Sequence, residues 1–199
     1  MAARPGSPRT GGFEPAPFDV VEASRSVWLD LWSPEAASGM AAFTAILRSY
    51  QLLNSGVTAV MNRHHLTFAR YEVLTWLATD PDSSLTLSWI SKTLRIPPAT
   101  VTNIMDRLEL DKHVRRVPHS SDGRTTVAII TPRGRRAATA ATEDLNASVY
   151  EQIGLSEDQR HQLTELLAQL RVAGNEFDVA RSPAVIEGVG LRRTAAEKK

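Results

Sequence analysis

The sequence predicts a mainly helical fold with one small β-hairpin in its second half. Apolar residues recur at helical spacing through most of the chain, between short segments of proline, glycine and serine. Two β-branched runs, residues 114–117 and 125–131, flank a turn-forming segment, which is typical of a hairpin. With 199 residues, of which 42% are hydrophobic, the chain is long enough to bury a core in one domain.

The composition limits the functional classes. No apolar run approaches the ~18 residues of a membrane-spanning helix. Residues 1–17 contain four prolines and three glycines but no apolar stretch, so we expect a flexible arm rather than a signal peptide, and a cytoplasmic protein. Cysteine is absent, which excludes disulfides, thiolate metal sites and thiol-based redox sensing.

The formal net charge of +1 conceals an asymmetry along the chain. Residues 84–136 contain 10 Lys and Arg against 4 Asp and Glu, whereas residues 137–180 contain 2 against 8. The first segment attracts polyanions and the second repels them. This polarity favours a DNA-facing lobe joined to a region with another role.

The N-terminal part of the sequence predicts three helices. Residues 18–32 carry apolar groups at the spacing of a short amphipathic helix. The serine and proline at 33–34 supply an N-cap and a first-position proline for a long helix that ends near residues 63–66. Thr67 caps the third helix, which the Asp-Pro pair at 80–81 ends.

A helix over residues 87–94 and a second one that begins at the proline pair 97–98 are joined by about four residues, the spacing of a helix-turn-helix. The second helix of such a motif enters the major groove of DNA. In this chain that helix has two different sides. Apolar residues at 101, 104, 105 and 108 predict a buried stripe, and Thr100, Asn103 and Arg107 lie opposite.

The polar side of this helix has the chemistry of a nucleic-acid contact. Uncharged polar groups with one guanidinium can reach base edges and phosphates from within a groove, whereas a helix face that meets only solvent more often carries Glu and Lys. For Arg107, an ion pair with Asp106 or Asp111 is an equal alternative. Ser88 and Lys92, at the front of the preceding helix, are further candidates for phosphate contact.

Two helices follow the hairpin. Pro132, which is preset for the first helical position, starts a helix that continues to Gly154. A capping box at 156–159 starts the last helix, which ends before Gly174. Beyond it the sequence is weakly patterned.

Two arginines in the first strand of the predicted hairpin, and three directly after the hairpin, are candidates for ion pairs or phosphate contacts. Because strand residues alternate between faces, we expect Arg115 rather than Arg116 to be internal to the base of the hairpin. Arg133, Arg135 and Arg136 lie in the first turn of a helix, where positive charge is unfavourable to the macrodipole. An external phosphate would explain these three residues, and plain solvation is the alternative.

A series of linked motifs crosses this basic region. Asp-Arg-Leu-Glu lies at 106–109, Val-x-Arg at 114–116, Asp-x-Arg at 122–124 and Ile-Thr-Pro-Arg-Gly at 130–134. Together with the order of the helices, from about residue 20 to residue 175, these motifs resemble the MarR family of winged-helix transcriptional regulators. The spacing of several motifs in one series makes the resemblance specific.

The resemblance implies a single MarR-like domain over residues 18–175, with a loosely ordered tail at 176–199. The helices in 18–64 and 132–174 would interlock in a homodimer, and each protomer would present the winged helix-turn-helix of residues 67–131. The two lobes would then lie one helical turn of DNA, ~34 Å, apart and read a pseudo-palindrome.

The resemblance also implies roles for single residues. Asn103 falls where family members place a base-reading side chain, often arginine, and asparagine can bond adenine. Arg124 would enter the minor groove, oriented by Asp122, although a surface ion pair is the simpler alternative. Gly123 replaces a second arginine of the family, and His113 replaces a glycine. The predicted DNA-binding residues are Ser88, Lys92, Pro98, Thr100, Thr102, Asn103, Arg107, Asp122 and Arg124.

Many members of the family bind small aromatic or phenolic anions in a cleft between the dimer helices and the winged lobe. Tyr50, His64, Arg70 and Trp76 come from elements that would wall such a cleft, and Arg70 suits an aromatic acid by charge pairing and stacking. The simpler alternative makes Trp76 a core residue and Arg70 a solvated one. The adjacent His64 and His65 point about 100° apart on a helix, so we expect no metal site.

The sequence therefore predicts a double-stranded DNA-binding transcriptional regulator, specifically a ligand-responsive repressor that binds a pseudo-palindromic operator as a homodimer. No catalytic constellation is recognisable, and we expect neither enzymatic activity nor a cofactor. Two alternatives stay open: a winged-helix protein–protein adaptor without a specific DNA target, and an enzyme with an unrecognised site.

Overall fold

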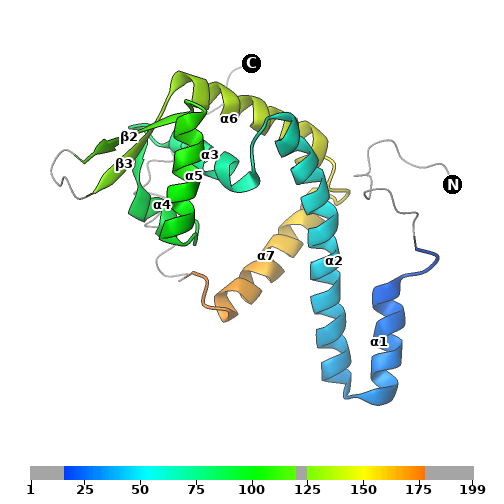
Figure 1. Cartoon of the computed structure of the whole chain (residues 1–199). Helices are drawn as coiled ribbons and strands as arrows, with labels where there is room; N and C mark the ends of the chain where they lie inside the picture. Colours follow the sequence, from blue (N-terminus) through cyan, green and yellow to red (C-terminus); the bar gives the residue numbers. More distant parts are fainter. Residues whose placement is uncertain (1–15, 120–124, 178–199) are drawn as a thin grey trace. The chain divides into compact units, whose positions relative to one another are not determined.

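The computed structural model describes residues 16–119 and 125–177, coloured along the chain in Figure 1. The chain divides into two compact units, one with the residues up to 65 together with 143–153, and the other with 66–142 and the residues from 154 onward. Most of the predicted arm and tail, and the tip of the predicted wing, lie outside the described residues. Within the described ranges, no helix combines the length and the apolar character that crossing a lipid bilayer requires.

The first unit contains a helical hairpin of α1 (Val20–Leu31) and α2 (Pro34–Arg63) (Figure 1). The side chains of Asp19 and Ser33 accept hydrogen bonds from backbone N–H groups in the first turns of these two helices. The chain returns to this unit as a π-helix, η1 (Asn146–Tyr150), which contacts α2. The predicted N-cap and first-position proline of α2 are thereby confirmed, whereas the first helix begins at Val20 rather than at residue 18.

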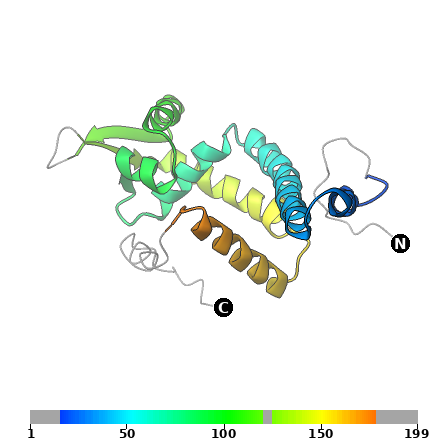
Figure 2. The same ribbon diagram turned by 90° about the horizontal axis from the view of Figure 1, so that it is seen from below.

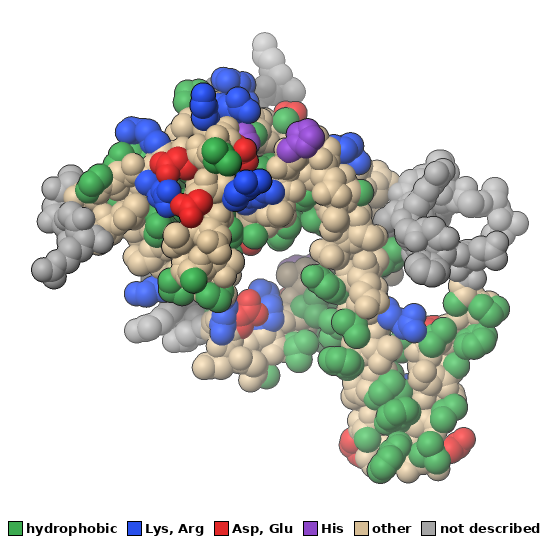
Figure 3. All heavy atoms as spheres, in the orientation of Figure 1, with side chains coloured by type: hydrophobic (Ala, Val, Ile, Leu, Met, Phe, Trp, Pro, Cys, Tyr) green, Lys and Arg blue, Asp and Glu red, His purple; other side chains and the backbone are tan. Residues whose placement is uncertain are grey.

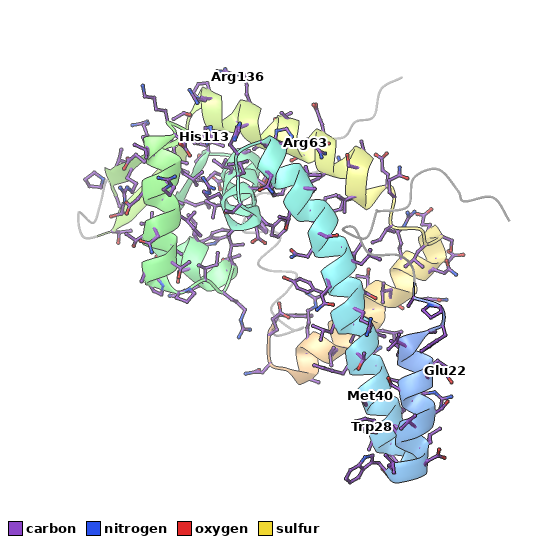
Figure 4. The ribbon with its side chains drawn as sticks, turned by 45° about the vertical axis from the view of Figure 1, so that its right-hand side comes forward. Glu22, Trp28, Met40, Arg63, His113 and Arg136 are labelled. Carbon is purple, nitrogen blue, oxygen red and sulfur yellow. The ribbon has the colours of Figure 1, made fainter. Side chains whose placement is uncertain are left out.

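Large apolar side chains remain exposed on this hairpin. Trp28 of α1 and Met40 of α2 lie in it (Figure 4), and hydrophobic side chains gather along both helices in the space-filling view (Figure 3). The exposed apolar residues here are Phe18, Val27, Trp28, Leu29, Leu31, Trp32, Phe43, Ile46, Leu47 and Tyr50.

The second unit contains the helix-turn-helix. It begins with α3 (Phe68–Thr79) and includes α4 (Leu87–Thr93) and α5 (Pro98–Leu110), which form the predicted pair. α6 (Pro132–Leu145) starts in this unit and ends in the first one. α7 (Glu157–Ala173) begins at the predicted capping box, in which the side chains of a serine and a glutamine bond each other's backbone N–H groups.

α6 begins at Pro132, as predicted, but it ends earlier than the sequence predicted. The sequence predicted one α-helix up to Gly154, whereas the α-helix stops at Leu145 and η1 continues only to Tyr150. The wider π-helix keeps Val149 buried, and its side chain lies 3.6 Å from the position of a Cβ on Gly56 of α2. A Cβ at position 56 would thus meet Val149 at an ordinary van der Waals distance, and α2 and η1 pack against each other here.

The predicted hairpin is part of a three-stranded sheet in the described residues. β2 (Val114–Pro118) pairs antiparallel with β3 (Thr126–Ile130), as predicted, and β1 (Ser84–Thr86) pairs with the other edge of β3. The sequence did not predict β1, because three residues are too few to show a period of two. Figure 2 shows the hairpin beside α5, which is seen end-on.

The core of the second unit lies between its helices and one face of the sheet. It holds Val73, Leu74, Leu77, Ile90, Met105, Leu108, Val114 and Ala128, all at most 2% exposed. This packing holds α5 and the hairpin together as one lobe.

Candidate nucleic-acid interface

The buried stripe of α5 fixes the orientation of the helix. Val101, Met105 and Leu108 are at most 1% exposed, and Ile104 is buried beside them, as the spacing predicted. The helix begins directly after two prolines, with Pro98 at its first position. One long side of α5 is therefore held against the core of the lobe.

The opposite side of α5 is open. Thr100, Asn103 and Arg107 are exposed, and their side chains form no hydrogen bond or ion pair with any residue in the part of the chain that the structure describes. Residues three and four apart lie on one helix face, so these three groups form a continuous polar strip. Thr102 is also exposed, and its hydroxyl donates to the carbonyl oxygen of Pro98 at 3.1 Å.

The two alternative partners of Arg107 are engaged elsewhere. Asp106 pairs with Arg116 at 2.7 Å, and Asp111 pairs with Arg70 at 3.5 Å. The guanidinium of Arg107 therefore stays available on the open side of α5, within the described residues.

Arg116 joins the hairpin to α5. Its Nε and Nη2 donate to Oε2 of Glu109 at 2.9 and 2.6 Å, its backbone N–H donates to Oε1 at 3.0 Å, and Nη1 lies 2.7 Å from Asp106. The prediction that Arg115 would be the internal arginine was wrong, since Arg115 is exposed. Arg116 lies two positions after the buried Val114 and so shares its face of β2, where Glu109 and Asp106 of α5 are its partners.

This network also changes the electrostatics of the open side of α5. The hydrogen bonds from Arg116 lower the pKa of Glu109 below its ordinary value, and the same bonds raise the pKa of Arg116. Asp106 and Glu109 are the acidic residues of α5. One guanidinium pairs with both carboxylates, so the strip is flanked by no unpaired carboxylate within α5, and the cluster of three side chains has a formal charge of −1.

The remaining predicted DNA contacts lie on α4 and in the hairpin. Ser88 is exposed in the first turn of α4, with its hydroxyl 3.1 Å from that of Thr86, and Lys92 is exposed one turn later. Asp122 and Arg124, the predicted wing residues, lie outside the described residues. The structure thus places seven of the nine predicted residues on exposed positions of α4 and α5.

The arginines at the start of α6 differ from one another. Arg135 donates to the carbonyl oxygen of Ala78 at 2.6 Å and to the hydroxyl of Ser83 at 2.7 Å, so it needs no external anion. The expectation of a phosphate partner was wrong for this residue, because its partners lie more than fifty positions away in the sequence. Arg133 and Arg136 are exposed, and Figure 4 shows Arg136 at the start of α6.

His113 lies where the family usually has glycine. Its Nδ1 is buried without a hydrogen-bond partner among the described residues, and burial lowers the pKa of the ring. A Cβ on Gly134 would lie 2.1 Å from the carbonyl oxygen of His113, so the chain of α6 approaches here more closely than a side chain allows. Gly134, the last residue of the Ile-Thr-Pro-Arg-Gly motif, permits this close approach.

The four candidate ligand residues each have partners within their own unit or are exposed. Arg70 is half-buried, and it bonds Thr67 at 3.3 Å in addition to its pairing with Asp111. The ring of Trp76 packs edge-on against Trp89, with centroids 5.5 Å apart. Arg70 is therefore neither a solvated side chain nor a cation that is free to bind a ligand. Trp76 packs against another aromatic ring of the same unit.

The other two candidates are Tyr50, on α2, and His64, the residue that follows the end of α2. Tyr50 is 60% exposed. His64 places Nε2 3.0 Å from Asp144, which also accepts two hydrogen bonds from Arg63. The Arg63 guanidinium, helped by the Ser148 hydroxyl and by His64, holds the pKa of Asp144 well below its usual range.

Comparisons with known proteins agree with this geometry. Residues 64–125 match the model of the MarR family. The HTH-type transcriptional regulator TtmR of Methylorubrum extorquens is 29% identical over 113 residues, which are 57% of this chain and 56% of TtmR. The chain therefore spans little more than half the length of that relative.

Solved structures extend the match over more of the chain. The MarR family transcriptional regulator Sco5413 of Streptomyces coelicolor is 38% identical and superposes with a TM-score of 0.64, over 71% of this chain and 98% of Sco5413. The transcriptional repressor CouR, solved bound to a 23-mer DNA duplex, is 25% identical with a TM-score of 0.58, over 66% of this chain and 90% of CouR. The chain belongs to the MarR family of transcriptional regulators.

Proposed function

We propose that this protein binds a specific double-stranded DNA operator and regulates transcription from it as a repressor. The observation that carries the proposal is the open side of α5, where Thr100, Asn103 and Arg107 are exposed without partners among the described residues. A helix of this kind reads base edges when it lies in a major groove. The DNA-bound structure of CouR supports the same use of the fold.

Each of the predicted residues is assigned a contact with DNA. Asn103 reads an adenine edge, Thr100 and Thr102 meet phosphate or a thymine methyl group, and Ser88 and Lys92 bind backbone phosphates. Beyond β2, Arg124 enters the adjacent minor groove with Asp122 orienting its guanidinium. The ion pairs of Arg116 with Asp106 and Glu109 fix the distance between α5 and the hairpin.

We further propose a homodimer. The large apolar side chains exposed along α1 and α2 mark an interaction site. Besides the exposed residues of α1 and α2, α7 exposes Leu163, Leu166 and Leu170. A second copy covers these surfaces and presents two lobes to a pseudo-palindromic operator. Phe43→Glu, which puts a charge at a 67% exposed apolar position, should give monomers in sedimentation and weaken operator binding.

Selection from random duplexes tests the DNA proposal directly. The protein should enrich a pseudo-palindrome with half-sites about one helical turn apart. Binding should weaken by orders of magnitude between about 50 and 200 mM salt, since several phosphates are contacted. An adaptor that only contacts proteins would enrich no sequence, which would overturn the proposal. Arg124→Ala should weaken operator binding and leave the dimer intact.

We also propose that an aromatic acid binds at Arg70 and releases the operator. An aromatic acid would have to compete with Asp111 for Arg70, because the two already pair at 3.5 Å. Titration of the operator complex with salicylate, as a probe for aromatic anions, should release DNA at millimolar concentrations. Arg70→Gln should abolish that release while leaving operator affinity unchanged. Release that persists in Arg70→Gln would exclude Arg70 as the ligand contact.

A further inference from the structure

The turn that follows α5 is closed by its own backbone. Lys112 takes a left-handed conformation with φ of 59°, and its N–H donates to the carbonyl oxygen of Glu109 at 2.9 Å. The N–H of His113 donates to the carbonyl oxygen of Leu108 at 2.8 Å. This pair of bonds is the Schellman end of a helix, so His113 is held in place against the last turn of α5.

Thr131 ties the same turn to the start of α6. Its backbone N–H donates to the carbonyl oxygen of His113 at 3.0 Å, and its hydroxyl donates to that of Lys112 at 2.8 Å. The Thr131 hydroxyl oxygen also accepts the N–H of Gly134 at 3.0 Å, as an N-cap does. The end of α5 and the start of α6 therefore meet at four residues, 112, 113, 131 and 134, which we call the α5–α6 joint.

The imidazole of His113 lies in this joint. Its Nδ1 is buried and has no hydrogen-bond partner in the part of the chain that the structure describes. A neutral ring can leave Nδ1 as an unused acceptor, whereas a protonated ring carries an N–H on both nitrogens. Protonation in this position would create a buried, charged donor without an acceptor, which is costly.

The charged groups that act on the ring come from three elements. Asp111 lies in the same turn, Arg70 on α3 and Arg133 on α6. Burial lowers the pKa of His113 below its ordinary value; the two arginines lower it further, and Asp111 raises it. Asp111 already pairs with Arg70 at 3.5 Å, so it is not free to hold an imidazolium. Protonation therefore favours an arrangement in which the ring leaves the joint.

The joint connects the helix that reads DNA in the proposed function to the helix that leaves the lobe. α5 carries the open polar strip, and α6 begins in the second unit and ends in the first. In the proposed dimer the two lobes must match the ~34 Å spacing of the major groove. Operator binding therefore requires one arrangement of the joint, whereas the free protein is not under this constraint.

We propose that His113 is a positioning residue whose protonation loosens the α5–α6 joint, so that operator affinity falls as the solution becomes more acidic. The proposal rests on the DNA binding proposed above and adds its regulation by protons. The direction of the effect is distinctive. Protons on histidines that face phosphate add positive charge and strengthen DNA binding, whereas a proton on His113 weakens it.

The pH dependence of operator binding tests the role of this ring. The complete protein and His113→Gln are compared on the selected operator by fluorescence anisotropy, at constant ionic strength, between about pH 7 and pH 5, a range that includes the ordinary histidine pKa. One buried donor without a partner costs about fivefold or more in an equilibrium constant. The Kd of the original protein should rise by about that factor for each protomer, and the Kd of His113→Gln should not rise.

A matched control removes a histidine from elsewhere in the chain. His161 is exposed on α7, where its Nε2 lies 3.2 Å from Glu165. His161→Gln should keep the full pH dependence of the original protein. If no duplex is bound at any pH, the proposed function fails. If the operator is bound but its Kd stays constant or falls with acidity, or if His113→Gln behaves like the original protein, the inference about His113 alone is wrong.

A titration of the histidine rings by nuclear magnetic resonance needs no substitution at position 113. Because binding of protons and of operator oppose each other, the pKa of His113 should be lower in the operator complex than in the free protein. An equal or higher pKa in the complex would overturn the proposal, whether or not His113→Gln folds.

Discussion

Replacing Arg116 by methionine should weaken DNA binding even if Arg116 never touches DNA. Arg116 pairs with Asp106 at 2.7 Å and with Glu109 at 2.6 Å, beside the open strip of α5. Methionine keeps an unbranched side chain on β2 but removes the guanidinium. The variant therefore presents two uncompensated carboxylates next to the phosphates that flank the major groove.

Coulomb's law gives the expected magnitude. Loss of one positive charge at about 10 Å from a phosphate costs about 0.4 kcal/mol in water, and salt at ~0.1 M reduces this several-fold. At ~0.15 kcal/mol for each phosphate, three or four phosphates give about 0.5 kcal/mol for each protomer. Two protomers on one operator then give about 1 kcal/mol, which is roughly a fivefold higher Kd.

The same variant should be only slightly less stable. The side chains of Glu109 and Asp106 are 38% and 52% exposed, so solvent screens most of the attraction to Arg116. Exposed ion pairs contribute at most about 1 kcal/mol to folding, and this loss should lower Tm by about 2–4 °C. Thermal unfolding measured beside the anisotropy titration separates the two effects.

A charge-balanced variant decides whether electrostatics is the cause. Asp106→Asn and Glu109→Gln are added to Arg116→Met, which removes the two exposed carboxylates together with the guanidinium. Operator affinity should return to within about 1.5-fold of the original protein, whereas Tm should stay low. The reasoning is refuted if the triple variant binds as weakly as the single one, or if Arg116→Met binds like the original protein.

Three further predictions concern single residues. Asn103→Ala should relax the base preference at one position of each half-site, and an unchanged selection profile would remove Asn103 from the reading face. Gly134→Ala should lower stability by about 1–3 kcal/mol, because the new Cβ would lie 2.1 Å from the backbone oxygen of His113; an unchanged Tm would contradict the close approach. Burial depresses the pKa of His113 below its ordinary 6.5, so the stability that the neutral ring contributes is present above that pH and is lost as pH falls through the lowered value. His113→Gln should therefore flatten the fall in Tm between about pH 7 and pH 5, and an equally steep fall in the variant would exclude this ring as the cause.

Features that depend on neighbouring residues could be predicted from the sequence. The starts of α2, α3 and α7 follow from the capping residues Ser33, Thr67 and Ser156, because a cap is a contact between residues two or three apart. The buried stripe of α5 follows from spacing alone, and so does the pairing of β2 with β3. These local rules, together with the linked motifs, were enough to identify the family.

Features that depend on distant partners could not be predicted. Arg135 bonds Ala78, 57 positions earlier, and Arg95 bonds residues about 80 positions later. Both look like solvated cations in the sequence. The third strand β1 was missed because its only strand partner, within the described residues, lies more than forty positions away.

The amino-acid sequence alone determined the helix pair, the hairpin and the open polar side of α5, because helical and strand periodicities place side chains on faces without reference to the rest of the chain. Only the tertiary structure decided which cations remain available to DNA. Arg116 and Arg135 are engaged by groups that folding brings to them, whereas Arg107 is left exposed because Arg116 and Arg70 take its carboxylates. The charge that a groove would meet depends on these pairings, and pairings at long sequence separation are set by packing.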